Sequence, residues 1–526
     1  MIPCPTRISF MEECLQRVNQ LQFQDSHEPF TLLHWRLKSH IFSFIVFVGN
    51  GDEQQLLDGK SFLNLSLVCR EWNQLLKDLR SSGNIPFDIS TTTIIGNQFD
   101  GFSIIPLKKI KKRFILIGND ENRRVGYFQA ALSSFGLPPA KTITWEKIVS
   151  TGVVNPLNHQ INVVDNNTIA PIDWNGIIDS IKKEYLINYG EEFNIEDVVI
   201  RFDSPGENFF VERGLFSLGC QPMLNEHYGT RVSEYDINNT LTFDLGQVRY
   251  IRQWYLGFVN AMDQIGQALG RLGIKPTQYM SSIDGIATTF DKRLCHNLLS
   301  KHEIPLPKAF YNIRTYDELH QILKENNMER VFIKPAHGSS ASGVIAYCFM
   351  EQKRGDTVMF KELATTSAEL IRDRNFPQYF KIYNSLRIKR YTKNDDIREL
   401  INFICSEGAI VEEWLEKADY MGRGNFDLRI IVIGGKIMNF VVRTSKNPMT
   451  NLHLGNKRGE CEDFLRLVEY KAPGSWDRVK ETCHRIGTEC LPSCLCLGVD
   501  LMFSEDFKQH YILEVNGFGD LSKFYL

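Results

Sequence analysis

The C-terminal half of the chain carries a succession of short apolar runs, each followed at once by charged or small residues. Residues 331–333 lead into Lys334 and Pro335, and eight mostly small residues, 336–343, come next. Small residues let a backbone approach phosphate oxygens, successive N–H groups form an anion cradle, and a lysine adds positive charge. Gly/Ser loops are common, and no Gly-Lys-Ser/Thr of a Walker loop follows. The run therefore predicts a strand and a phosphate-binding loop of another kind.

A second apolar run, residues 409–415, predicts a strand that leaves Glu412, Glu413 and Trp414 at its end. A purine needs backbone donors and acceptors beside an apolar wall, and its ribose needs a carboxylate. This strand end therefore suits the base and ribose of a nucleotide.

Two strand pairs follow. Residues 426–433 and 437–443 flank a Gly-Gly-Lys turn, which predicts a hairpin, and Asp427 and Arg429 share a face because they lie two apart. Residues 498–502 and 511–517 form the second predicted pair.

The second pair carries Asp500, Glu514 and Asn516, which offer only oxygen ligands. Such ligands suit a hard cation such as Mg²⁺ that bridges phosphates. Any one carboxylate is more often structural, so it is the ordered set that points to a site.

The order of these signals closely resembles the ATP-grasp superfamily, and within it the branch of the ribosomal-protein glutamate ligases and lysine-biosynthesis ligases. The resemblance implies an α+β ATP-grasp domain over residues 276–526, behind a Rossmann-like α/β pre-grasp domain over 113–275. It also implies ATP and Mg²⁺, with two metal ions expected and Mn²⁺ as an alternative.

The resemblance assigns roles residue by residue. The expected nucleotide-binding residues are Lys292 and Lys334 at the phosphates, His337, Gly338, Ser339, Ser340 and Gly343 in the loop, and Glu412, Glu413, Trp414, Leu415 and Asp427 toward the base and ribose. Arg429 and Arg443 are expected to face phosphate and acyl group, with Asn451 in the loop 450–456 beside the acceptor. Asp500, Glu514 and Asn516 match the metal ligands. The sequence ends ten residues after Asn516, where many members carry a further acceptor-holding helix, so the acceptor is less defined than the nucleotide.

The expected pre-grasp domain begins with a buried strand, 113–118, and a helix, 121–135, capped by Asn119 or Asp120. Residues 198–200 predict a second strand, and Ser204 with Glu207 predicts a capped helix start after it. That turn offers free N–H groups, so it is equally consistent with a ligand site and with a plain turn.

Residues 30–82 predict a small all-α unit, after an N-terminal lead (1–29) and before a linker (83–112). The string Leu-Val-Cys-Arg-x-Trp, residues 67–72, resembles the second half of an F-box, although the usual Leu-Pro opening is absent and the loop 49–60 is long. The resemblance implies docking to the Skp-type adaptor of a cullin–RING ubiquitin ligase. The alternative is a helical hairpin packed on the rest of the chain.

The composition excludes several other classes. The net charge is −3, so neither nucleic acid nor an acidic membrane is expected as the main partner, and no apolar stretch approaches a membrane span. Twelve scattered cysteines indicate free thiols in a reducing cytoplasm, and the cluster at residues 483–496 is better explained by packing than by zinc. The basic run 108–113 is typical of a linker end, with a nuclear localisation patch as the alternative.

Three hypotheses for function follow. The first is an ATP-dependent carboxylate–amine ligase that acts through an acyl phosphate on an amino acid, peptide or protein. The second is an ATP-grasp phosphotransferase, and the third is a non-enzymatic F-box substrate receptor. The F-box-like unit indicates the cytosol of a eukaryotic cell, with a bacterial protein delivered into a host as an alternative source.

Overall fold

The computed structural model describes most of the chain from residue 111 onward. The described residues are 111–135, 137–150, 168–206, 208–338, 341–354 and 357–519, without the side chains of 351–360. The expected lead, F-box-like unit and linker up to residue 110 lie outside them, as do Gly136, Glu207, Ser339 and Ser340. Docking to an adaptor therefore stays a prediction.

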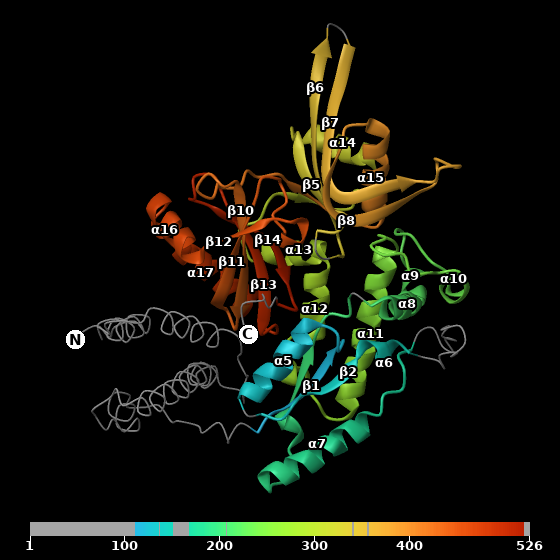
Figure 1. Ribbon diagram of the computed structural model, residues 1–526, viewed down its shortest axis with the longest axis vertical. Helices are drawn as coiled ribbons and strands as arrows, with labels where there is room; N and C mark the ends of the chain where they lie inside the picture. Colours follow the sequence, from blue (N-terminus) through green and yellow to red (C-terminus); the bar gives the residue numbers. More distant parts are fainter. Residues whose placement is uncertain are drawn as a thin grey trace, which may run out of the picture. The chain divides into compact units, whose positions relative to one another are not determined.

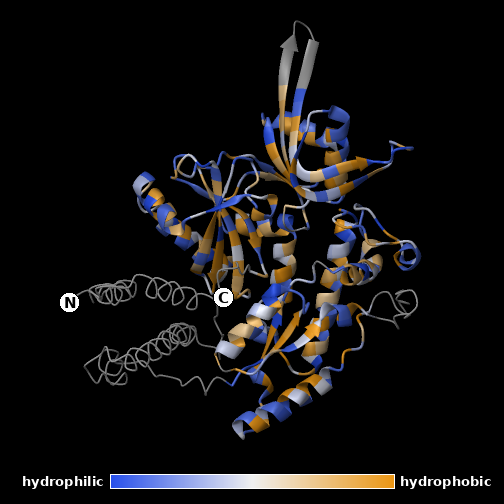
Figure 2. Ribbon diagram, viewed as in Figure 1, coloured by the Kyte–Doolittle hydropathy of each residue, from blue (hydrophilic) through white to orange (hydrophobic). Residues whose placement is uncertain are grey.

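The first part is a three-stranded parallel sheet in the order β2-β1-β3. Its strands are β1 (Arg113–Gly118), β2 (Lys141–Thr144) and β3 (Val198–Phe202). Every residue of β1 and β3 is buried, as their apolar runs predict, and Figure 2 shows these strands mainly in the apolar colour. The helices of this part are α5 (Arg123–Ser134), α6 (Trp145–Val149), α7 (Trp174–Tyr189), α8 (Phe209–Leu218), α9 (Cys220–Met223), α10 (Glu234–Asn239) and α11 (Ile251–Arg271), with short turns η2 (Ile195–Asp197) and η3 (Pro276–Gln278).

Both helix starts beside this sheet differ from the prediction. Asn122 caps α5, a few residues later than predicted, and Asn208 caps α8 in place of Ser204. Asn119 is buried instead, and its amide donates to the carbonyl oxygen of Pro205 at 3.1 Å. This bond ties the two strand-to-helix turns to each other, so tertiary contact decided which residue was left to act as the cap.

Helix α11 packs its apolar face into the core beside this sheet and lies closely against α8. At Gly257 of α11, an added Cβ would lie 1.8 Å from the carbonyl oxygen of Leu215, so the approach requires glycine. The same core takes in Ile286 of α12 (Ile283–Phe290). It therefore extends beyond residue 275, where the sequence predicts a domain boundary.

The second part is an antiparallel six-stranded sheet in the order β4-β9-β5-β6-β7-β8. The strands are β4 (Ala309–Phe310), β5 (Arg330–Pro335), β6 (Ile345–Arg354), β7 (Thr357–Arg372), β8 (Phe380–Tyr391) and β9 (Ala409–Glu413). Helices α14 (Tyr316–Glu325) and α15 (Asn394–Ser406) contact each other, and α15 lies against β5, β7, β8 and β9. Figure 1 shows β6 and β7 running on as a paired ribbon beyond the other strands. The two strands predicted from apolar runs, β5 and β9, are direct neighbours.

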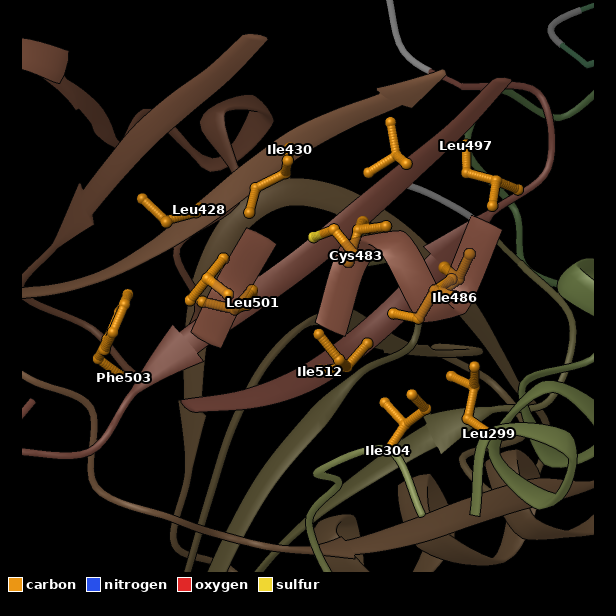
Figure 3. Close-up of a cluster of buried hydrophobic side chains, with 14 of the residues drawn as sticks. Leu299, Ile304, Leu428, Ile430, Cys483, Ile486, Leu497, Leu501, Phe503 and Ile512 are labelled. Atoms are coloured by element: carbon orange, nitrogen blue, oxygen red, sulfur yellow. The ribbon is translucent and has the colours of Figure 1, made fainter. Parts of the chain in front are cut away.

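The third part is an antiparallel five-stranded sheet in the order β12-β11-β10-β13-β14. The strands are β10 (Asn425–Ile433), β11 (Lys436–Ser445), β12 (Lys457–Gly459), β13 (Cys496–Phe503) and β14 (His510–Asn516). The helices and turns are α13 (Lys292–Lys301), η4 (Leu452–Leu454), α16 (Cys461–Lys471), α17 (Ser475–Arg485) and the π-turn η5 (Ile486–Cys490). Figure 3 shows its core, in which Leu428, Ile430 and Leu501 of the sheet lie with Cys483 of α17 and Leu299 of α13.

Both predicted strand pairs are confirmed. β10 and β11 form an antiparallel hairpin whose turn residues, Gly434 and Gly435, have positive φ angles of 53° and 74°. β13 and β14 pair antiparallel, with Asp500 directly opposite Glu514. The described chain is thus a mixed α/β protein, which agrees with the predicted fold class for that part.

Two expectations from composition can be followed in the described residues. None of their helices combines the length and apolar character needed to cross a bilayer. Every cysteine among them is a free thiol, and the buried Cys483, Cys490 and Cys494 show no grouping that would hold a metal ion.

Candidate active site

A cleft runs between strands β5 and β9 of the six-stranded sheet and strands β10, β11, β13 and β14 of the five-stranded sheet. It encloses about 830 Å³ of space, including its open mouth. Eleven of the predicted site residues line it: Lys292, Lys334, Gly338, Glu412, Glu413, Leu415, Asp427, Arg443, Asn451, Asp500 and Glu514. Residues that are far apart in the sequence therefore meet in one cavity.

The two lysines enter the cleft from different elements. Lys334 is the second-to-last residue of β5, and its Nζ lies 2.5 Å from Oε2 of Glu412 on the neighbouring β9. Lys292 is the first residue of α13, and its Nζ donates to the carbonyl oxygen of Gly338 at 2.7 Å and lies 3.3 Å from Oε1 of Glu514. Both ammonium groups are held by the protein at low exposure, so a bound anion would meet positive charge that is already positioned.

The small-residue loop begins directly after β5. Gly338 has a φ of 141°, which L side chains rarely adopt, and it lines the cleft. Gly343 has a φ of 72°, and an added Cβ there would lie 3.0 Å from the ring of Pro335. Gly343 is not among the residues that line the cleft, so it shapes the loop from behind; Ser339 and Ser340 lie outside the described residues.

The end of β9 supplies the apolar and acidic wall. Glu412, Glu413 and Leu415 line the cleft together with apolar residues of other elements, among them Phe332 and Met502. Trp414 does not line it: its ring packs against the ring of Phe332, with centroids 5.0 Å apart. Trp414 thus supports the wall that Phe332 presents to the cleft.

A row of alternating charges crosses the opposite wall. Asp427 and Arg443 are paired on β10 and β11, with Nε 2.7 Å from Oδ1, and Nη2 of Arg443 lies 3.2 Å from Oδ1 of Asp500. Arg429 stands opposite Asp500 on β13, with Nε 2.6 Å from the same oxygen, but it does not line the cleft. Burial opposes ionisation of Asp427, yet Arg443 and Lys417 hold its pKa at about 2. Asp427 is therefore an anion in the folded protein.

Asp500 and Glu514 form the predicted metal-binding edge. Burial raises the pKa of Asp500, although Arg429 and Arg443 act to lower it. Burial also acts to raise the pKa of Glu514, but the nearby Lys292 lowers it below its ordinary value. The two arginines do not offset the burial of Asp500, and a divalent cation would add further positive charge beside it. Two facing carboxylates are donors that Mg²⁺ accepts, with phosphate and water completing its shell, so the residues fit the ion.

The third predicted metal ligand is set back from these two. Asn516 does not line the cleft, and its amide nitrogen donates to the carbonyl oxygen of Gly498 at 3.4 Å. No cluster of three His, Cys, Asp or Glu residues suited to a metal occurs in the described part of the chain.

Lys417 is a cleft residue that the sequence did not reveal. Its Nζ lies 3.3 Å from Oδ2 of Asp427 and donates to Oγ1 of Thr450 at 3.0 Å. Burial lowers its pKa, while Asp427 raises it. Its only sequence signal is a charged residue two positions after Leu415, because the contact depends on how the chain folds back beside β13.

The loop expected beside the acceptor is tied to the same charges. The hydroxyl of Thr450 donates to Asp427, and Asn451 lines the cleft. The amide of Asn456 closes the loop by donating to the carbonyl oxygens of Met449 and Asn451 at 2.8 and 3.0 Å. Asp427 therefore connects the nucleotide wall to this loop.

His337 lies behind the loop and not in the cleft. Its side chain is 1% exposed and stacks on Tyr255 of α11, with ring centroids 3.9 Å apart. Burial holds the pKa of His337 well below its ordinary value, so the ring is neutral.

No protein-family model matches this chain. A coenzyme γ-F420-2:α-L-glutamate ligase of Methanocaldococcus jannaschii is 22% identical over 264 residues, which is 48% of this chain and 69% of that protein.

Among solved structures, the ATP-grasp ligase PsnB complexed with a minimal precursor is 11% identical, covers 78% of this chain and 92% of its own, and has a TM-score of 0.38. The D-cycloserine synthetase DcsG is 10% identical over 77% of this chain and 92% of its own, with a TM-score of 0.38. D-alanine–D-alanine ligase from Bacillus anthracis complexed with ATP is 14% identical over 48% and 61%, with a TM-score of 0.28. All three TM-scores are below 0.5, and all three identities are below 25%.

Proposed function

We propose that this chain is an ATP- and Mg²⁺-dependent ligase that joins a carboxylate to an amine through an acyl phosphate and releases ADP. One observation carries the proposal: two lysines, a buried arginine and two facing carboxylates meet in the same cleft as an apolar and acidic wall. That combination offers charge to phosphates, ligands to a hard cation and a surface to a base. The similarity to a glutamate ligase supports the same chemistry.

The proposed reaction has two steps. An oxygen of the donor carboxylate attacks the γ-phosphorus of ATP, forming an acyl phosphate as the bond to the β,γ-bridging oxygen breaks and ADP leaves. The acceptor amine then attacks the acyl carbon, inorganic phosphate leaves with the bonding electrons, and the amine loses a proton. The protein supplies no nucleophile, so its contribution is positioning and charge neutralisation.

The chain's cations would divide this work. Lys292 of α13 and Lys334 of β5 both line the cleft and would bind phosphate oxygens. Arg443 lies between Asp427 and Asp500, so its guanidinium is fixed before substrates bind and would face the transferred phosphoryl group or the acyl phosphate. Fixed charges of this kind need little reorganisation during reaction.

Asp500 and Glu514 would hold Mg²⁺, with Asn516 as the expected third ligand set back at the end of β14. When bound, the ion would neutralise charge on the phosphates and orient them. Toward the other end, Glu413, Leu415 and Phe332 would hold the base and ribose.

The first test is ADP release by the purified protein with Mg-ATP, against amino-acid pools and a eukaryotic cell lysate. The proposal expects turnover with free phosphate in the wild type and none in Asp500→Asn. Phosphate retained on a product would instead establish the phosphotransferase. ATP binding without turnover in any pool would favour the non-enzymatic receptor.

We further propose that residues 30–82 dock a Skp-type adaptor, which would place the enzyme on a cullin–RING ligase inside a eukaryotic cell. The string at residues 67–72 supports this. Co-purification with the adaptor tests it, and changes at polar or aliphatic positions of the unit are better probes than Trp72→Ala, which mainly tests helix packing. Failure to bind the adaptor would leave the ligase proposal untouched.

A further inference from the structure

A buried polar cluster lies behind the small-residue loop and outside the cleft. Its centre is His337, which follows the end of β5 and is 1% exposed. One face of the ring stacks on Tyr255 at 3.9 Å with an interplanar angle of 12°. Arg252, one turn earlier on the same helix α11, places Nη1 3.0 Å from Nε2 of His337. The ring is therefore held from two directions by one helix.

The geometry fixes the tautomer of His337. A guanidinium can only donate, so Nε2 accepts and the proton of the neutral ring resides on Nδ1. Nδ1 is buried and has no hydrogen-bond partner among the described residues. Burial lowers the pKa of His337, and the nearby cations Arg252, Arg293 and Lys292 lower it further. Asp291 acts in the opposite direction. Protonation of Nε2 would place two donors face to face.

Arg252 is itself anchored in both directions. Its Nη2 lies 2.8 Å from Oε1 of Glu226, and its backbone N–H donates to Oε2 of the buried Glu407 at 3.2 Å. Tyr255 donates its hydroxyl to the carbonyl oxygen of Ala287 in α12 at 3.1 Å. The groups that hold His337 are thus fixed by residues from several elements, and they cannot follow the ring if it moves.

The two residues that flank His337 both accept hydrogen bonds from Lys292. The backbone N–H of Lys292 donates to Ala336 at 2.9 Å, and its Nζ donates to Gly338 at 2.7 Å. Asp291, which caps α13 ahead of Lys292, has Oδ2 3.7 Å from Nε2 of His337. Any displacement of residue 337 therefore displaces two carbonyl groups, one that holds the backbone of Lys292 and one that holds its ammonium group.

We propose that His337 is a positioning residue that never touches the nucleotide: clamped by Tyr255 and Arg252, it fixes the start of the small-residue loop and the ammonium group of Lys292 for the phosphates. The inference rests on the proposed ATP site. Through this clamp, helix α11 of the parallel-sheet part would affect phosphate binding in a cleft that the other two sheets form. The sequence predicts that His337 binds the nucleotide, whereas we infer that it positions Lys292, which would do so.

The test compares binding of Mg-ATP and of adenosine by calorimetry or competition. His337→Leu removes the acceptor for Arg252, so the ammonium group of Lys292 should no longer be positioned for the phosphates. Affinity for Mg-ATP should then fall by about ten- to a hundredfold, the value of one hydrogen bond between charged groups. Affinity for adenosine should not change, because it lacks phosphates. His337→Gln should recover most of the loss, since its side-chain oxygen can accept from Arg252.

His320→Leu is the matched control. His320 is also a largely buried histidine bonded to another side chain, with Nε2 2.8 Å from the hydroxyl of Tyr347, but it lies in α14 away from the cleft. This variant should lose stability without losing Mg-ATP affinity. Unchanged Mg-ATP affinity in folded His337→Leu, or an equal loss for adenosine, would overturn the proposal.

Hydrogen exchange of the nucleotide-free wild type provides a second measurement that survives misfolding of the variant. The amide of Ala336, which donates to the carbonyl oxygen of Gly408 at 2.9 Å, should exchange slowly, and Arg252→Lys, which keeps the charge but loses the planar guanidinium, should speed its exchange. Rapid exchange in the wild type would refute the clamp. Absence of any ATP binding by the wild type would reject the proposed function, whereas the exchange data would still decide on the clamp.

Discussion

Asp427 and Arg443 occupy opposed positions on β10 and β11, and Nε of Arg443 lies 2.7 Å from Oδ1 of Asp427. Both side chains are buried, and the same guanidinium reaches Asp500. Removing one partner would leave a buried charge without compensation, which commonly destabilises by about 3–5 kcal/mol. One pair thus connects the stability of the five-stranded sheet to the charge balance of the cleft.

Arg443→Met should therefore affect both activity and stability. Turnover should fall on the order of 10²–10³-fold, because the proposed preorganised cation at the transferred group is lost. Arg443→Lys should not restore it, since an ammonium cannot serve two carboxylates as a planar fork does. ADP release and thermal unfolding measure the two effects, with the exposed Lys436→Met as control. Near-normal turnover in folded Arg443→Met would contradict the assignment.

Asp500→Asn and Glu514→Gln should abolish turnover while leaving the fold intact. The proposed cation would lose one of two facing carboxylates, and its neutralising effect on the phosphates would go with it. Turnover of the wild type should likewise stop on chelation of Mg²⁺ and return when it is added back. Glu505→Gln, at an exposed position after β13, should behave as wild type. Retained turnover in either purified mutant would count against the metal assignment.

Lys417→Met tests the cleft residue that the sequence did not reveal. Asp427 would keep Arg443 but lose its second cation, and Thr450 would lose a donor. Because both contacts lie between the nucleotide wall and the loop 450–456, kcat/KM for Mg-ATP should fall on the order of tenfold. Steady-state ADP release gives the value, and the exposed Lys446→Met is the matched lysine control. Identical kinetics in all three proteins would remove Lys417 from the site.

The strands that frame the cleft could be predicted, because their signals are local. Residues 331–335 and 409–413 are apolar runs of strand length, and the Gly434–Gly435 turn defines the hairpin that places Asp427 and Arg429 on one face. Most of the site residues that were expected from the order of the charged residues line one cavity.

The remaining differences arise from tertiary contacts that a single sequence does not encode locally. Trp414 follows two cleft-lining glutamates but packs on Phe332, and Arg429 pairs with Asp500 but does not line the cleft. His337 precedes a cleft-lining glycine, yet helix α11, eighty residues earlier, holds its ring away from the cavity. Lys417 gains its role only because it pairs with Ser504, directly after β13.

His510 should make stability fall as the pH drops. Burial lowers its pKa to about 4, below the ordinary unfolded value of about 6.5, and its Nε2 lies 2.8 Å from Oγ1 of Thr482. Between these two pKa values the unfolded chain binds more protons than the folded chain. The contribution of His510 to the free energy of unfolding is therefore complete above about pH 6.5 and is lost toward pH 4, by up to about 3 kcal/mol. His510→Gln should flatten this part of the thermal-midpoint profile.

The control for that profile is His227→Gln, because His227 is exposed. It should keep the wild-type slope between pH 6.5 and 4. A wild-type slope that survives in His510→Gln would show that other groups carry the pH dependence.

Two glycines of α11 should respond in opposite ways to alanine. At Gly257 an added Cβ would meet backbone atoms of α8 and its C-cap, 1.8 Å from the oxygen of Leu215 and 2.8 Å from the nitrogen of Gly219. Backbone cannot yield as a side-chain tip can, so Gly257→Ala should push the helices apart and destabilise by about 1–3 kcal/mol or more. At Gly270, near the end of the same helix, an added Cβ meets nothing within 4 Å, so Gly270→Ala should stabilise by about 0.5–1 kcal/mol.

The pair separates helix propensity from packing, because the chemical change is the same at both positions. Denaturant or thermal unfolding of the two variants measures it. Because Arg252 and Tyr255 lie within a turn or so of Gly257, the displaced helix in Gly257→Ala should also weaken Mg-ATP binding, whereas Gly270→Ala should not change it. Stabilisation by both changes would show that α8 and α11 are not in close contact at Gly257.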